Sequence, residues 1–139
     1  MDEAAVRKRE ALRKVEDAVG RRLSPPGRGG ATTLPSGRRL LLAYGHEHAR
    51  AHGEAGFSVG IPNRLPSADF LLLLLGDDDL VVPTEVFTRH WEEGSQSGDS
   101  RPTPIIRRRA REAGFYAQFG RDGAIEDLTQ YIGGYSRLA

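Results

Sequence analysis

Three of the four histidines of this chain lie within seven residues, in the segment 46–52 (His-Glu-His-Ala-Arg-Ala-His). If the segment is helical, His48 and His52 stand one turn apart on the same face and could share a metal ion. A third ligand would have to come from a distant part of the chain, because the spacing from His46 does not fit the His-Glu-x-x-His zinc motif. The segment is polar and bordered by glycines, so we predict a solvated loop and keep His48 and His52 only as candidate metal ligands.

Three consecutive aspartates, at positions 77–79, separate two apolar runs. Carboxylate oxygens suit Mg²⁺ and Ca²⁺, but the alternating ligands, internal glycine and final glutamate of a calcium loop are missing here. Consecutive aspartates between two strands are typical of a hairpin turn. We therefore predict a solvated turn and no metal site at these positions.

A further set of acids follows the order helix, strand, helix. Glu10 or Glu16 lies in the first predicted helix, Asp69 begins an apolar run, and Glu85 follows the next apolar run. This order, with the runs Asp-Phe-Leu-Leu-Leu-Leu-Leu from Asp69 and Leu-Val-Val-Pro-Thr-Glu-Val around Glu85, resembles the PD-(D/E)XK nucleases of the restriction-endonuclease-like fold. The resemblance covers roughly residues 56–132.

The resemblance implies that Asp69 and Glu85 would hold Mg²⁺ if the chain cleaves DNA. The family's reaction also needs a lysine that supports the attacking water, and no lysine follows Lys14 in this chain. The resemblance therefore favours a relative without catalytic residues or cofactor, a DNA-binding domain accessory to a restriction or defence nuclease. A degenerate metal-dependent nuclease, with an arginine in place of the lysine, remains the alternative.

The net charge of +1 conceals a strong segregation of charge along the chain. Residues 1–64 carry +5, residues 65–100 carry −7 and residues 101–139 carry +3. Blocks of one sign indicate a surface with an oriented electrostatic field. A protein-interaction module is therefore a third interpretation, in which the acidic region 77–99 meets a basic partner or a second copy of the chain.

Eighteen of the twenty basic residues are arginine, which makes bidentate contacts with phosphates and with guanine edges. The predicted DNA contacts are Arg38, Arg39, Arg101, Arg107, Arg108, Arg109 and Arg111. Together with Arg7, Arg9 and Arg13 of the first helix, they predict one phosphate-facing surface. Tyr44, Phe57 and Trp91 are the candidate rings for stacking on a base. The alternative, that Phe57 and Trp91 are core residues and the cluster is a solvated hairpin, stays open.

The hydrophobic pattern predicts the elements that would position these residues. An N-terminal segment 1–23 contains a helix over 3–20, a Gly/Pro-rich loop spans 24–37, and the core follows over 38–139. Strands are predicted at residues 39–44, 56–61, 69–75, 80–82, 103–108 and 115–119, and short helices at 83–91 and 126–132. The class is α+β, with a mixed or mostly antiparallel sheet of five to six strands, an inserted helix and a C-terminal helix.

The totals narrow the class of protein further. A chain of 139 residues predicts a single domain. It has no cysteine, which excludes disulfides and thiolate metal sites. No apolar run is long enough for a membrane helix, and the charged N-terminus does not resemble a signal peptide, so we predict a cytoplasmic protein without a membrane partner. No serine lies in a nucleophile elbow, which argues against a serine hydrolase.

Overall fold

The six apolar residues that follow Asp69 form strand β4 (Phe70–Leu75), and all six are buried. Side chains of a strand point alternately to its two faces. Leu71, Leu73 and Leu75 accordingly belong to one core cluster, and the alternate residues belong to a second. A strand that is covered on both faces must lie at the centre of the fold, as its sequence predicts. The computed structural model in which this is seen describes residues 3–23, 31–47, 55–59, 68–94, 105–108, 114–118 and 125–139.

β4 belongs to an eight-stranded mixed sheet whose main path runs β5-β4-β2-β3-β6-β7-β8. β2 and β4 are parallel, and the other pairs are antiparallel. β1 pairs with the first residues of β2, and β3 pairs with the last residues of β2. β1 and β3 therefore lie one after the other along the same edge of β2. The remaining strands are β1 (Ala31–Thr33), β2 (Arg39–Glu47), β3 (Ala55–Val59), β5 (Asp78–Pro83), β6 (Ile105–Arg108), β7 (Phe115–Gln118) and β8 (Ile125–Asp127).

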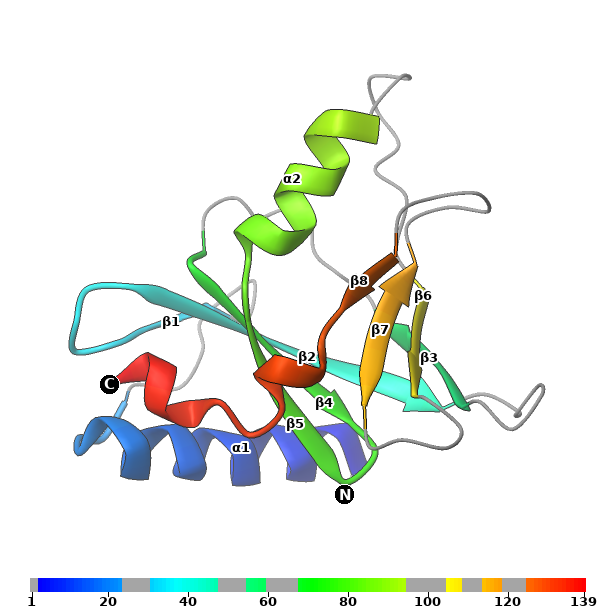
Figure 1. The fold of residues 1–139 in the computed structure, drawn as a ribbon. Coiled ribbons are helices and arrows are strands. Elements are labelled where there is room, and N and C mark those ends of the chain that lie inside the picture. Colours follow the sequence, from blue (N-terminus) through cyan, green and yellow to red (C-terminus); the bar gives the residue numbers. More distant parts are fainter. Residues whose placement is uncertain are drawn as a thin grey trace.

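The two ends of this sheet return toward each other. After β8 the chain passes through the 3₁₀-helix η2 (Thr129–Tyr131) and reaches β5, where Ile132 forms a bridge with Leu80. The N–H of Gly133 then donates to the carbonyl oxygen of Asp79 at 2.7 Å. Figure 1 shows this orange and red segment returning toward the green β4–β5 hairpin. The sheet therefore curls into a partly closed barrel.

The inner face of the curled sheet encloses the larger core cluster. Phe57, Ile106 and Phe115 contribute to it from β3, β6 and β7, and the rings of Phe57 and Phe115 lie 6.0 Å apart. Helix α2 (Glu85–Gly94) adds Val86 and Phe87 from its first turn. Each fully buried side chain of this size stabilises the fold by roughly 1.5–3 kcal/mol.

The outer face of the sheet is covered by helix α1 (Glu3–Val19), which lies along β2 and β4 (Figure 1). Ala11 and Val15 of α1 are buried against this face. The C-terminal 3₁₀-helix η3 (Tyr135–Leu138) packs beside α1 and places Leu138 in the same cluster. The amphipathic helix predicted over 3–20 is confirmed, and its apolar stripe explains where it docks.

The α+β class is confirmed, with differences at its margins. The sheet has eight strands and not five or six, because β1 lies within the predicted loop 24–37 and β8 overlaps the start of the predicted closing helix 126–132. Three-residue strands are too short to show a period-two pattern. Of the predicted closing helix only the 3₁₀-helix η2 forms, and the Asp127 carboxylate accepts hydrogen bonds from the N–H and hydroxyl of Thr129 at its start, at 3.0 and 2.6 Å. Gly133, with φ of 65°, then turns the chain into η3.

The turn between β1 and β2 depends on Gly37, whose φ is 87°. Replacing Gly37 with alanine is expected to cost about 1–2 kcal/mol, because L side chains disfavour the left-handed region. Nothing lies within 4 Å of the added carbon, so the loss would come from the backbone alone. Urea unfolding measures it. Gly56→Ala is the matched control, since Gly56 has the same open space without a positive φ; equal losses for both variants would contradict the assignment.

Candidate nucleic-acid interface

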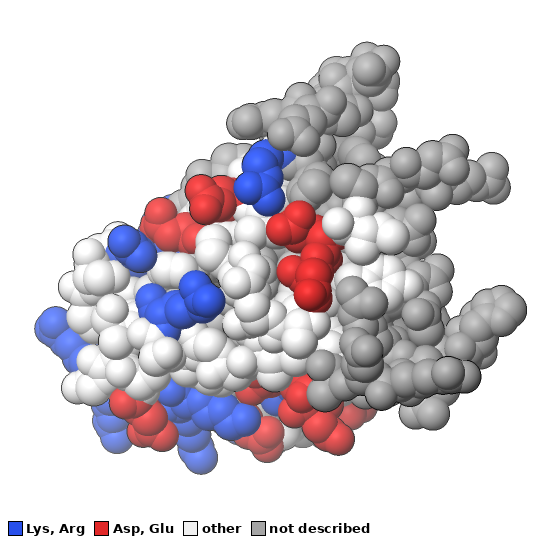
Figure 2. All heavy atoms as spheres, viewed as in Figure 1, with Lys and Arg blue, Asp and Glu red and all other residues white. Residues whose placement is uncertain are grey.

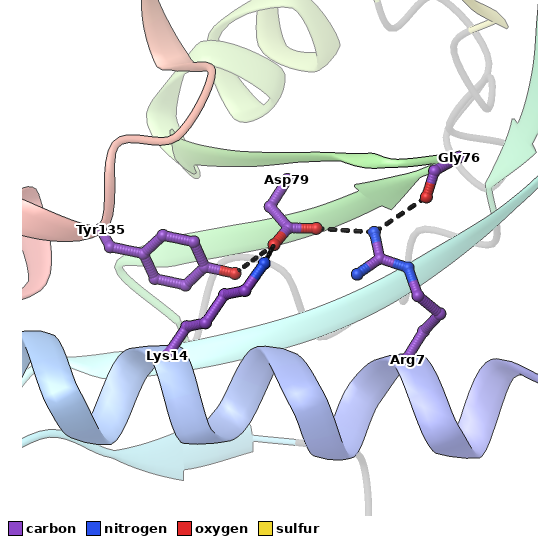
Figure 3. Close-up of polar contacts among 5 residues, drawn as sticks. All are labelled: Arg7, Lys14, Gly76, Asp79 and Tyr135. Carbon is purple, nitrogen blue, oxygen red and sulfur yellow. Dashed lines mark hydrogen bonds and ion pairs between the residues drawn. The ribbon is translucent and has the colours of Figure 1, made fainter.

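The last of the three aspartates is not a solvated turn residue. Gly76 and Asp77 form the turn, and Asp79 pairs with Leu74 in the β-ladder. The side chain of Asp79 is only 4% exposed. Figure 3 shows it facing α1, where its carboxylate accepts hydrogen bonds from Arg7 Nη2 at 2.6 Å, Lys14 Nζ at 3.2 Å and Tyr135 Oη at 2.6 Å. The prediction of a solvated turn is therefore wrong for Asp79, which joins the hairpin, α1 and η3.

A signal for this cluster is present in the sequence. Arg7 and Lys14 are seven residues apart, which places them on one face of a helix after two turns. Asp79 alternates with Leu80, so it shares a strand face with Val81, which α1 covers. Arg7 also donates to the carbonyl oxygen of Gly76 at 2.9 Å, and its side chain is 17% exposed. Arg7 is thereby removed from the predicted phosphate-facing surface.

The contacts within this cluster favour the charged forms of Asp79 and Arg7 and the neutral form of Tyr135. Burial opposes ionisation of Asp79, but the hydrogen bonds from Tyr135, Arg7 and Lys14 outweigh it and hold the pKa of Asp79 below its ordinary 3.8. Burial and the hydrogen bond to Asp79 raise the pKa of Tyr135 well above its ordinary 10.0. Burial also opposes the charge on Arg7, yet the contact with Asp79 leaves the pKa of Arg7 raised.

These pKa shifts predict that the protein loses stability both in acid, through Asp79, and in alkali, through Tyr135. Because the folded-state pKa of Asp79 is lowered, its contribution is present above pH 3.8 and is lost as the pH falls through the folded-state value. Because the pKa of Tyr135 is raised, its contribution is present below pH 10.0 and is lost as the pH rises through the folded-state value. The free energy of unfolding, measured against pH, should show a smaller alkaline loss in Tyr135→Phe and a smaller acid loss in Asp79→Asn. Profiles parallel to the wild type would contradict both assignments.

Asp69 has a structural task at the start of β4. Its carboxylate accepts the N–H of Arg39 at 2.9 Å, and its own N–H donates to the carbonyl oxygen of Arg39 at 2.9 Å. Its carbonyl oxygen accepts the N–H of Thr84 at 3.0 Å, which places Asp69 near Glu85, the exposed first residue of α2. Asp69 and Glu85 therefore lie at the same end of the β4–β5 hairpin. Asp69 sets the parallel register of β2 and β4.

The described part of the chain brings together no group of three His, Asp or Glu residues that could hold a metal ion. Of the helix acids, Glu16 accepts the N–H of Leu23 at 2.8 Å just beyond the end of α1. His48 and His52 lie outside the described residues. His46 is exposed in β2, where its ring meets that of Tyr44 edge-on at 5.0 Å.

The three candidate stacking rings differ in position. Phe57 is 1% exposed in the inner core, so its assignment as a base-stacking ring is wrong and the core alternative holds for it. Tyr44 is half-buried and lines a hollow of about 650 Å³ together with the acids Glu3, Glu47 and Asp77. This acidic surrounding disfavours nucleic acid at Tyr44. Trp91 lies in α2, and its side chain is outside the described part of the structure.

Four exposed arginines gather at the other end of α1. Arg21 and Arg22 directly follow the helix, and Arg38 and Arg39 follow the turn between β1 and β2. We call these four residues the basic end. The guanidinium of Arg38 stacks over the ring of Phe70, 5.6 Å from its centroid, which holds the side chain on the α1 side of the sheet. Figure 2 shows blue side chains at the left, the end of the molecule at which both the last turn of α1 and the β1–β2 turn lie in Figure 1.

A hollow of about 380 Å³ lies within the basic end and is lined by residues 21–23 and 31–35. Leu34, in its wall, donates its N–H to the carbonyl oxygen of Arg38 at 2.8 Å. Thr33, also in the wall, pairs with Arg39 in the β-ladder. These contacts join the backbones of the two segments. The side chain of Arg38 lies over Phe70 on the α1 face of the sheet, whereas Arg39 alternates with Leu40 and points to the face of Leu41, so a ligand that contacts all four arginines must reach around this end of the sheet. Arg21 and Arg22 were not among the predicted DNA contacts, because their place beside β1 depends on the fold.

The remaining predicted contacts lie elsewhere. Arg107 and Arg108 are in β6, where Arg107 pairs with Gly56 and Tyr116, and their side chains are outside the described part. β6 is on the far side of the sheet from the β1–β2 turn (Figure 1). Arg101, Arg109 and Arg111 lie outside the described residues. The backbone of Arg107 and Arg108 therefore lies away from Arg38 and Arg39, which does not favour the single surface predicted.

Comparison of the chain with protein-family models, with curated proteins and with solved structures gives no match. None of the helices in the described ranges is long and apolar enough to cross a membrane. The function of this chain must therefore be inferred from its own residues and their geometry.

Proposed function

We propose that this chain binds nucleic acid, in the first place double-stranded DNA, through the basic end. The observation that carries the proposal is the position of four exposed arginines, Arg21, Arg22, Arg38 and Arg39, on two segments that β1 brings to one end of the molecule. Arginine forms bidentate, charge-assisted hydrogen bonds with phosphate oxygens. Among the described residues, none of the four forms an ion pair with a carboxylate, so their charges are available to a polyanion.

The distribution of charge on the rest of the molecule supports an oriented encounter. Among the described residues, the hollow at the opposite end of α1 is lined by Glu3, Glu47 and Asp77, and by Arg7, which is paired with Asp79. A polyanion would be repelled from that end and attracted to the basic end. The molecule therefore presents a defined orientation to DNA even though its net charge is only +1.

We propose binding without cleavage. The carboxylate of Asp69 accepts a backbone N–H of Arg39, which gives it a role in strand pairing. The lysine that the resemblance to PD-(D/E)XK nucleases calls for is missing after Lys14. An accessory domain beside a restriction or defence nuclease is the context that this resemblance suggests.

Fluorescence anisotropy with labelled DNA duplexes and single strands at about 50 mM salt tests the proposal. We expect saturable binding of the duplex that weakens as salt is added, because each phosphate contact releases counterions. Absence of binding to every nucleic acid at low salt would refute the proposal. Retained binding in a variant that lacks all four arginines of the basic end would refute the assigned surface.

A further inference from the structure

The hollow within the basic end differs in shape from a surface that only follows a DNA backbone. It is concave, with the Arg21-Arg22 pair on one side and strand β1 on the other. Its volume of about 380 Å³ is in the range of sites that take a small molecule or one group of a larger ligand. An internal phosphate of a duplex is flanked by sugars in both directions, whereas a terminal phosphate projects from the end of its strand. A strand end is the part of DNA that can enter such a hollow.

The charges at the hollow suit a phosphate monoester better than an internal phosphodiester. A monoester carries about −1.5 to −2 charges at pH 7 and three acceptor oxygens, whereas a diester carries one charge. Two adjacent guanidinium groups can each donate two hydrogen bonds to it. The nearby carboxylate of Glu16 is engaged by the N–H of Leu23.

From this placement we propose that the hollow binds the terminal phosphate of a DNA strand. The inference rests on the proposed function and refines it, because it divides the basic end into two parts. Arg21 and Arg22 would contact the terminal phosphate within the hollow. Arg38 and Arg39, on the turn that forms its rim, would contact phosphates farther along the duplex. The chain would then distinguish DNA ends from uninterrupted DNA.

The experiment compares duplexes of one sequence that carry 5′-phosphate, 3′-phosphate or only hydroxyl ends, together with a closed dumbbell that has no ends. We expect the wild-type chain to bind one of the phosphorylated duplexes at least about tenfold more tightly than the hydroxyl duplex. Arg21→Gln/Arg22→Gln should abolish this preference, so that phosphorylated and hydroxyl duplexes bind this variant with equal affinity. Arg38→Gln/Arg39→Gln should weaken binding to all duplexes and keep the preference.

Equal affinity of the wild-type chain for phosphorylated, hydroxyl and dumbbell DNA would overturn the inference and leave the proposed function intact. Absence of binding to any DNA would overturn the proposed function, and the inference with it. Inorganic phosphate provides the remaining arm. If inorganic phosphate abolishes the preference for phosphorylated ends at concentrations similar to those of the oligonucleotide, the hollow is a site for free phosphate and the inference is overturned. If much higher concentrations of inorganic phosphate are needed, the result supports the inference.

Discussion

Replacing Asp79 with alanine is expected to lower the free energy of unfolding by about 3 kcal/mol. The side chain of Asp79 is 4% exposed and accepts hydrogen bonds from Arg7, Lys14 and Tyr135. Its removal leaves Arg7 partly buried without its counter-charge and Tyr135 without an acceptor, and both groups are costly in that state. Urea unfolding at neutral pH measures the loss.

The neighbouring residue supplies a matched control. Asp78 is on the same strand, carries the same charge and is more exposed than Asp79. Asp78→Ala is therefore expected to change the free energy of unfolding by no more than about 0.5 kcal/mol. Equal effects of Asp78→Ala and Asp79→Ala would show that the cluster does not hold α1 and η3 to the hairpin.

Replacing the four arginines of the basic end with glutamine is expected to lower the affinity for duplex DNA at least about 100-fold at 0.1 M salt. Each arginine removed deletes one phosphate contact and the counterion release that accompanies it. The double variants Arg21→Gln/Arg22→Gln and Arg38→Gln/Arg39→Gln should each lose at least about tenfold. All four side chains are exposed, so the free energy of unfolding should change little.

Lys8→Gln/Arg9→Gln is the control for net charge. Both residues are exposed in the N-terminal half of α1, away from the basic end, and their replacement removes the same charge as each double variant. We expect this control to retain affinity within about threefold, because screening limits the influence of charges more than a Debye length away. A control as weak as the double variants would show that DNA binding follows total charge and not the basic end.

The central elements of the fold could be predicted from local pattern alone. The uninterrupted apolar run of β4 can only be a strand covered on both faces, and the apolar spacing of α1 predicts one buried stripe. The three-residue strands β1 and β8 could not be predicted, because their pairing depends on neighbours that only the fold supplies.

Less of the candidate site could be predicted from the sequence, because it depends on contacts between residues that are far apart along the chain. Arg7 and Asp79 are 72 residues apart, and nothing local shows that they meet. The sequence alone therefore predicts a DNA contact at Arg7 and a turn residue at Asp79. Phe57 was considered for stacking although β3 carries it into the inner core. Arg38 and Arg39 can be predicted as DNA contacts from their residue type alone. Arg21 and Arg22 become candidates only when the structure shows that α1 ends beside β1.

The dependence of DNA affinity on salt is the most direct test of the claim that the basic end contacts DNA phosphates. A plot of log K against log salt concentration should be linear for the wild-type chain. Its slope should become less negative by about 3 to 4 units when all four arginines are replaced with glutamine, because each duplex phosphate contact contributes about 0.9. The same slope in the wild-type chain and the four-arginine variant would contradict the account.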